Sequence, residues 1–172
     1  MIFTPLKGIT AYRMHKPVWA TMPISGVGAG KHGGRVNRPG VNALYLSLDS
    51  QTAIAEYQQV SSLLPPGTLV AYTLSVAKLI DFTGGYDRSW PPLWQEFYCD
   101  WRRLWFDRRV EPPSWILGDE AIKAGAKGIL FMSTVNPGGR NLVLFIDHLD
   151  VSDRIEVFDP GGLLPKNRDS WK

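Results

Sequence analysis

The sequence of 172 residues contains one cysteine, Cys99, and only three histidines, which are scattered along the chain. A single cysteine excludes an intrachain disulfide and a zinc site built from cysteines. The histidines, His15, His32 and His148, do not have the spacing of metal ligands, so we expect no metal site. Cys99 lies within an aromatic run and is expected to pack there rather than to act as a nucleophile.

Long hydrophobic segments are also lacking. No apolar run is long enough to span a membrane, and the first residues, MIFTPLKG, lack an apolar stretch of signal-peptide length. We therefore expect a cytoplasmic protein that does not contact a membrane. The net charge is only +3, and the basic residues are spread rather than clustered as a nucleic-acid surface requires. Direct nucleic-acid binding is therefore the least favoured reading.

The familiar nucleotide-binding and hydrolase motifs are absent or incomplete. Gly28, Gly30 and Gly33 match G-x-G-x-x-G, but turn-like residues follow them where a helix is required. A phosphate-binding P-loop fails because Ser25 replaces its first glycine and His32 replaces its Ser or Thr. No serine lies in a G-x-S-x-G motif. We interpret residues 24–34 as a mobile loop, and whether its part 26–34 closes over a substrate is left open.

What the chain does contain is the composition of one globular domain. Hydrophobic residues make up 44% of the sequence and charged residues 20%. These shares and the length suit a single domain with its own core, covering residues 1–172. Residues 161–172 are polar and are expected to form a loose tail. The sequence contains no internal repeat.

The most informative stretch runs from Gly33 to Glu56. Strand-forming residues 43–48 (ALYLSL) follow a turn at 37–40, and Ser47 and Asp49 are candidate N-caps of a helix. The helix is indicated by apolar residues at helical spacing: Ala53, Tyr57, Val60 and Leu64. Glu56 lies about 60° from the middle of this stripe, at the edge of the buried face. A carboxylate placed there is usually solvated, although it could also serve a site that handles positive charge.

Six residues in order and spacing resemble the RES-domain toxin family: Arg13 in TAYRM, Arg35 in GGRVN, Tyr45 and Ser47 in LYLS, Glu56 in AIAEY, and Ser133 in GILFMSTVNPGGRNLVL. The resemblance covers residues from about Ala11 to about Pro160. Residues 115–119 (WILGD) and 136–142 (NPGGRNL) also resemble family segments. The chain departs from the family at Val36, where many members carry Trp, and at Met14, where some carry Tyr, which could alter how the substrate fits.

The resemblance implies an α+β fold similar to ADP-ribosyltransferases, with two small, mostly antiparallel sheets forming a cleft and helices flanking them. It implies the toxin of a bacterial type II toxin–antitoxin pair that cleaves the nicotinamide–ribose bond of NAD, its substrate. The acceptor of ADP-ribose stays open between water, inorganic phosphate and a protein side chain. The expected partner is an Xre-type, helix-turn-helix antitoxin that blocks the cleft, and DNA would be reached only through it. The alternative is an inactive relative that binds a nucleotide or partner without turnover.

The resemblance also implies roles for these residues. Glu56 would stabilise the positive charge that develops on the ribose, and Arg13 and Arg35 would hold the phosphates, whose oxygens match a guanidinium fork. Tyr45 would stack on or hydrogen-bond the nicotinamide ribose, and Ser133 would donate to the substrate. Arg35, Glu56 and Ser133 form the predicted catalytic set, and Arg13, Tyr45 and Ser47 complete the binding set. The ordinary readings are a turn serine at 133 and a cross-strand packing residue at 45.

Regular elements are predicted in the rest of the chain. Strands are expected at 9–14, 69–76, 128–132, 141–146 and 154–158, and residues 79–82 form a short strand or continue the one before. The strands at 128–132 and 141–146 can form a hairpin. Ser114 is expected to cap a helix that runs to Ala124.

A helix over residues 93–108 would carry one aromatic stripe, formed by Trp94, Tyr98, Trp101 and Trp105. Such a stripe usually packs on the core. A homodimer or partner surface is the alternative, because Trp, Tyr and Arg are enriched at interfaces.

Overall fold

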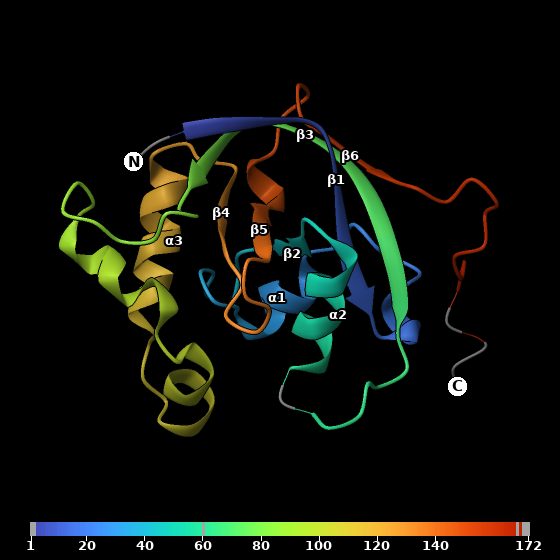
Figure 1. Ribbon diagram of the computed structural model, residues 1–172, viewed down its shortest axis with the longest axis horizontal. Coiled ribbons are helices and arrows are strands. Elements are labelled where there is room, and N and C mark those ends of the chain that lie inside the picture. The colour runs from blue at the N-terminus through green and yellow to red at the C-terminus, as the bar shows by residue number, and fades with distance from the viewer. Residues whose placement is uncertain (1–2, 60, 168, 170–172) are drawn as a thin grey trace.

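Figure 1 shows the computed structural model, which describes residues 3–59, 61–167 and 169. Its strands are β1 (Phe3–His15), β2 (Ala43–Ser47), β3 (Thr68–Asp81), β4 (Gly128–Met132), β5 (Arg140–Phe145) and β6 (Arg154–Val157). Its α-helices are α1 (Val27–His32), α2 (Ser50–Gln58) and α3 (Pro113–Lys123). Short 3-10 helices are η1 (Pro17–Trp19), η2 (Pro92–Tyr98) and η4 (Ile146–His148), and η3 (Arg103–Asp107) is a π-helix. The mixture of helices and one sheet confirms the expected α+β class.

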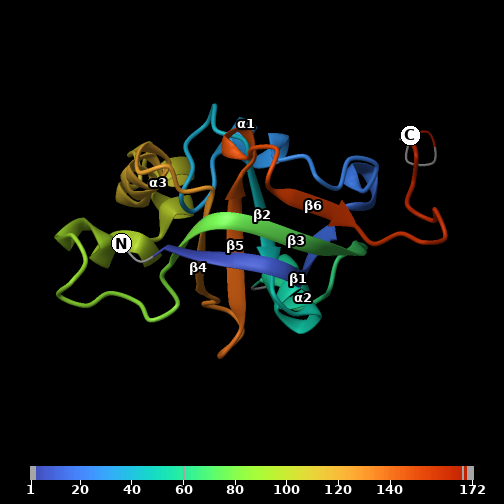
Figure 2. The same ribbon diagram turned by 90° about the horizontal axis from the view of Figure 1, so that it is seen from above.

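The described strands form a single sheet in the order β1-β2-β5-β4-β3-β6, and β1 also pairs with β3. The pairings are antiparallel except for the parallel pair β3–β4. Figure 2 shows the long strands β1 and β3 crossing over β2, β5 and β4. Two separate small sheets were expected, and this was wrong. The long strands β1 and β3 run in a different direction from β2, β5 and β4. The pairs β1–β2 and β3–β4 nevertheless join the two groups into one sheet through hydrogen bonds.

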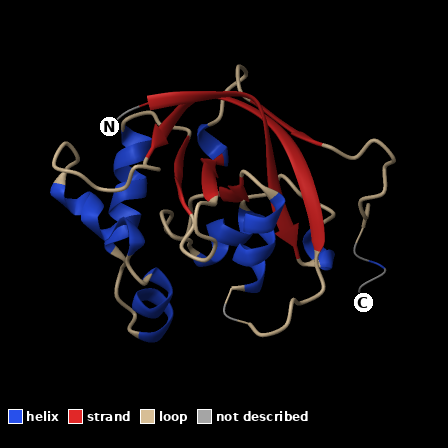
Figure 3. Ribbon diagram, in the orientation of Figure 1, coloured by secondary structure: helices blue, strands red, loops and turns tan. Residues whose placement is uncertain are grey.

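Buried side chains lie on both faces of the sheet, as strand alternation requires. In β5, Val143 belongs to one cluster with the aromatic residues of η2, whereas Leu142 and Leu144 belong to a second cluster with β1 and β3. Figure 3 shows the long strands across one side of the molecule, with the three α-helices below them. The sheet is therefore packed on both faces, and this fixes the strand ends that carry the candidate site.

The helix expected at 93–108 is replaced by two short helices with a break between them. Trp94 and Phe97 pack on Phe82 with ring centres 5.1 and 4.6 Å away. Cys99 then adopts an extended backbone (φ −54°, ψ 154°), and the chain turns before η3. Core packing overrides the weak helix preference of this aromatic run. The core interpretation is confirmed for Trp94, which is 0% exposed and belongs to a core cluster. Trp101 is also buried, at 8% exposure, but it lies outside the core clusters and lines a cavity, and a homodimer stays a prediction.

Two other helical expectations also need correction. The helix after Asp49 ends at Gln58, because Gln59 has a φ of 50° that interrupts it. Leu64 is exposed rather than part of a buried stripe, and Val60 lies outside the described residues. Residues 24–34 are not a loop throughout, since Val27–His32 form α1. Gly26 packs against the main chain of Ala43 so closely that an added Cβ would lie 2.7 Å from its nitrogen.

Several expectations are confirmed. Asp49 is the N-cap of α2 and accepts a hydrogen bond of 2.7 Å from the Thr52 N–H. The strands β4 and β5 form the predicted antiparallel hairpin, and Ser133 directly follows β4. The stretches expected at 69–76 and 79–82 belong to one continuous strand, β3.

The expected cap at Ser114 was wrong, because α3 starts at Pro113 and Pro112 occupies the cap position. In the described part of the chain, no helix is long and apolar enough to cross a membrane.

Candidate active site

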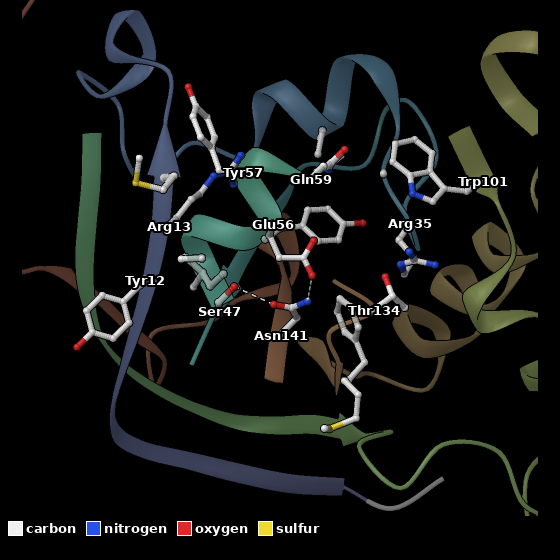
Figure 4. A pocket seen from close by; sticks show the side chains of 18 of the residues that line it. Tyr12, Arg13, Arg35, Ser47, Glu56, Tyr57, Gln59, Trp101, Thr134 and Asn141 are labelled. Carbon is white, nitrogen blue, oxygen red and sulfur yellow. Dashed lines mark hydrogen bonds between the residues drawn. The ribbon is translucent and has the colours of Figure 1, made fainter. Parts of the chain in front are cut away.

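A cavity of about 300 Å³ lies between β1, β2, α2, the loop at 33–35 and the segment at 101–102. It is lined by five of the six residues predicted from the sequence: Arg13, Arg35, Tyr45, Ser47 and Glu56. The sixth, Ser133, reaches the site through a hydrogen bond to Glu56. Figure 4 shows the Glu56 carboxylate near the centre of this view, with Arg13 and Arg35 on opposite sides of it. The fold thus gathers residues that are up to 120 positions apart in the sequence, 133 minus 13.

The Glu56 carboxylate is held at one of its two oxygens. Its Oε1 accepts a hydrogen bond of 2.8 Å from Ser133 Oγ and one of 2.6 Å from Asn141 Nδ2. Asn141 Oδ1 in turn accepts a hydrogen bond of 2.8 Å from Ser47 Oγ, which fixes the orientation of the Asn141 side-chain amide. No described residue donates to Oε2 of Glu56. One carboxylate oxygen is therefore fixed by the protein, and the other is available to a ligand.

Ser133 forms hydrogen bonds both with Glu56 and with the turn that follows β4. Its Oγ accepts hydrogen bonds from the N–H groups of Val135 (3.2 Å) and Asn136 (3.0 Å) while it donates to Glu56. A serine hydroxyl has one proton to donate. In this arrangement Ser133 positions Glu56 instead of donating to a ligand. It also lines a second hollow of about 290 Å³, next to the cavity, with Tyr98 and Thr134.

Arg35 is carried by a loop that is tied to α3. Trp115 Nε1 donates to the Gly34 carbonyl at 2.7 Å, and Ser114 Oγ donates to the Arg35 carbonyl. An added Cβ at Gly118 would lie 1.7 Å from the Val36 carbonyl oxygen, so only glycine allows the helix and the loop to approach this closely. The Arg35 guanidinium makes only two long hydrogen bonds of 3.4 Å, to main-chain carbonyls. No described carboxylate forms an ion pair with it.

Arg13 projects into the cavity from β1. Burial lowers its pKa, and the nearby hydroxyls of Tyr72 and Tyr45 offset part of this effect. Its Nη1 is buried, and no described group forms a hydrogen bond with it. An unpaired buried charge costs free energy. The cavity is therefore prepared to receive a negative group near Arg13.

His15 lies two residues further along β1 and is also buried. Its Nε2 is 2.6 Å from the Tyr72 hydroxyl, which donates to the Pro23 carbonyl at 2.9 Å. Because that hydroxyl proton goes to Pro23, His15 must be the donor through Nε2. Burial, and then the charge of Arg13, lower the His15 pKa to about 4. His15 is therefore neutral at pH 7.

Tyr45 uses its hydroxyl within the protein. The hydroxyl donates to Asn37 Oδ1 at 2.7 Å and accepts from the Val36 N–H at 3.1 Å. Burial raises its pKa, so the group stays a neutral phenol. Tyr45 thus fixes the loop beside Arg35, and its ring is the part left to contact a ligand.

Several cavity residues were not predicted as site residues: Tyr12, Tyr57, Trp101, Arg102, Thr134 and Asn141. Asn141 could have been suspected, because it is a polar residue at the start of the apolar strand NLVLF and lies in a family-like segment. Trp101 was assigned to packing or to a partner surface, and Arg102 was given no role in the site. Among the described residues, no group of three or more His, Cys, Asp or Glu side chains could hold a metal ion.

Comparisons with known proteins agree with this picture of the fold. A family model described as the RES domain matches residues 10–166. A crystal structure described as the M. tuberculosis MbcT–MbcA toxin–antitoxin complex is similar, with a TM-score of 0.59 and 21% sequence identity. The match covers 91% of this chain and 85% of that one. A comparison with the curated proteins finds no match.

Proposed function

The chain belongs to the RES-domain family, and on this premise we propose that it is an enzyme that cleaves the nicotinamide–ribose bond of NAD. Breaking this bond gives the ribose carbon oxocarbenium-like positive character. A carboxylate fixed beside that carbon stabilises the charge as it develops, and a fixed group needs no reorganisation during the reaction. The observation that carries the proposal is the Glu56 carboxylate, held by Ser133 and Asn141 in a cavity that also contains arginines.

The charges of the cavity suit a dinucleotide. NAD carries two negative charges on its pyrophosphate, and guanidinium groups bind phosphate oxygens in pairs. We assign Arg13 and Arg35 to the phosphates, because no described carboxylate neutralises either of them. Tyr45 contributes its ring to the nicotinamide ribose, and Ser47 supports Glu56 through Asn141.

The acceptor of the ADP-ribosyl group decides the reaction class. Attack by water gives ADP-ribose, and attack by inorganic phosphate gives ADP-ribose-1″-phosphate. Attack by a protein side chain gives an ADP-ribosylated protein. An NMR time course of the purified protein with NAD, run with and without phosphate, identifies the second product. Binding of NAD without release of nicotinamide, even after cell lysate is added, would support an inactive binding module instead.

A protein that consumes NAD harms its own host, so we also propose that it is the toxin of a toxin–antitoxin pair. The partner would be an Xre-type antitoxin whose segment blocks the cavity and whose helix-turn-helix part contacts DNA. Expression without the partner should stop bacterial growth, and Glu56→Gln should relieve the arrest. Glu96→Gln is the matched control, because Glu96 is exposed and lies outside the cavity. Normal growth with confirmed levels of soluble wild-type protein would contradict the toxin proposal.

A further inference from the structure

A third arginine, Arg102, lines the same cavity as Arg13 and Arg35. It comes from the break between η2 and η3, far in sequence from the residues that suggested the site. Its guanidinium carbon lies 4.7 Å from the centre of the Trp101 ring, within cation–π range. Trp101 is itself 8% exposed and lines the cavity. The guanidinium of Arg102 thus lies against a buried aromatic side chain, although part of the residue is exposed to solvent.

Arg102 lies on the Arg35 side of the cavity. Figure 4 shows Trp101 beside Arg35 and across from Arg13. Burial, and next the charge of Arg35, lower the pKa of Arg102, while Glu56, Tyr45 and Asp100 offset part of the effect. Two like charges therefore lie close enough to repel each other, and no described carboxylate forms an ion pair with either. An anion bound between them would relieve this repulsion.

The only carboxylate that lines the cavity among the described residues is Glu56, and it cannot neutralise three arginines. The lining charges sum to +2, from three arginines and one glutamate. Figure 4 shows Arg13 on the other side of Glu56 from Arg35, so Arg102 adds a second cation on the Arg35 side of the cavity. The segment that carries Arg102 continues into a π-helix, a feature often found at functional sites.

We propose that Arg102 is a substrate-binding residue that pairs with Arg35 to hold the pyrophosphate of the dinucleotide. The inference rests on the proposed function and extends it by naming the residue that recognises the phosphates on this side of the cavity. Arg102 binds the substrate in the ground state and in the transition state alike. Its removal should therefore raise KM and leave kcat nearly unchanged.

Binding can be measured without turnover in the Glu56→Gln variant. Titration calorimetry should show that adding Arg102→Ala weakens NAD binding at least about tenfold, the loss typical of a charged hydrogen bond. Arg102→Lys should restore part of the affinity, because it keeps the charge and loses the guanidinium fork. The matched control is Arg103→Ala, whose side chain is exposed and outside the cavity. It should bind NAD like the parent variant.

A ligand without phosphate separates recognition from a structural effect. Nicotinamide riboside, followed by ligand-observed NMR, should bind Glu56→Gln equally well with and without Arg102→Ala. If Arg102→Ala weakens the affinity for NAD and for nicotinamide riboside equally, the role of Arg102 is overturned and the proposed function stays intact. The same holds if the affinity for NAD and the KM are both unchanged. If the Glu56→Gln and wild-type proteins bind no NAD at all, the proposed function and this inference both fail.

Discussion

Arg35 and Arg38 are three residues apart in one loop, and their surroundings are opposite. Arg38 forms ion pairs of 2.9 Å with Glu111 and 2.6 Å with Asp119, which tie the loop to α3 and the chain before it. These carboxylates raise its pKa, mainly because they accept the hydrogen bonds that the Arg38 guanidinium donates to Asp119 and then to Glu111. Arg35 lines the cavity and has only two long bonds to carbonyl oxygens. The same residue type is neutralised by the protein in one place and left for a ligand in the other.

The contrast separates residues that hold the fold from residues that we propose hold a substrate. A paired arginine supports the structure and should have little effect on chemistry. An arginine that lines a cavity and has no carboxylate partner adds positive electrostatic potential there, which favours the binding of a negative ligand. Arg13 and Arg102 fall in the second group with Arg35. The following predictions test this division.

Among the arginine variants, the largest effect is expected for Arg35→Ala. It should lower kcat/KM for NAD by about 100- to 1000-fold, because a cation that binds a phosphate group is lost. Arg38→Ala, in the same loop, should change kcat/KM by less than about threefold. Steady-state assays of nicotinamide release measure both. Equal losses in the two variants would contradict the division.

His15 should make folding sensitive to acid. Its folded pKa of about 4 lies below its ordinary value of 6.5, so the unfolded chain binds the proton more readily. The stability from neutral His15 is complete above pH 6.5 and is lost as the pH falls toward 4, by about 3 kcal/mol. A proton there would also place a second positive charge beside unpaired Arg13.

Urea denaturation at a series of pH values measures this loss. His15→Gln should flatten the stability curve between pH 6.5 and 4. His148→Gln, at an exposed position, should leave the curve unchanged. A wild-type curve that is already flat over this range would show that His15 is not buried in its neutral form.

Asn141→Ala tests whether Glu56 must be held in place. The change removes the 2.6 Å donor to Glu56 Oε1 and should lower kcat about 30-fold, with little change in KM. The matched control is Asn136→Ala, which removes a bond of 2.8 Å to Thr52 rather than to Glu56. A rise in KM at unchanged kcat would instead make Asn141 a binding residue.

The smallest effect is expected in the stability of Arg38→Ala. Its ion pairs are partly exposed, with side-chain exposures of 34%, 49% and 44% for Arg38, Glu111 and Asp119, so solvent screens them. We expect a loss of about 1 kcal/mol in the free energy of unfolding. Chemical denaturation measures it. A loss in Arg35→Ala larger than in Arg38→Ala would mean that Arg35 also supports the fold.

The sequence predicted local elements well wherever one signal dominated. Asp49 was recognised as a cap because its side chain suits the free N–H groups of a helix start, and the β4–β5 hairpin followed from two apolar runs joined by turn residues. The break at Cys99 was missed because helical spacing cannot show that Trp94 enters the core while Trp101 turns to the cavity. The single sheet was missed because strand pairing depends on contacts distant in sequence.

The candidate site was predicted through its order of residues rather than its geometry. The positions of Arg13, Arg35 and Glu56 around one cavity follow the expectation. The positioning of Glu56 by Asn141 and the presence of Arg102 were not foreseen, because both depend on how β5 and the 99–103 segment approach α2 in space. Ser133 follows β4, as expected, but it donates its proton to Glu56.

The proposed cleavage of NAD depends on the carboxylate of Glu56, which Ser133 and Asn141 hold in place. The most direct measurement is nicotinamide release by purified wild-type, Glu56→Gln and Glu96→Gln proteins, followed by NMR at matched concentrations. We expect release by wild type and Glu96→Gln, and a loss of about 1000-fold or more in Glu56→Gln, which still binds NAD. Equal release by wild type and Glu56→Gln would contradict the role of Glu56.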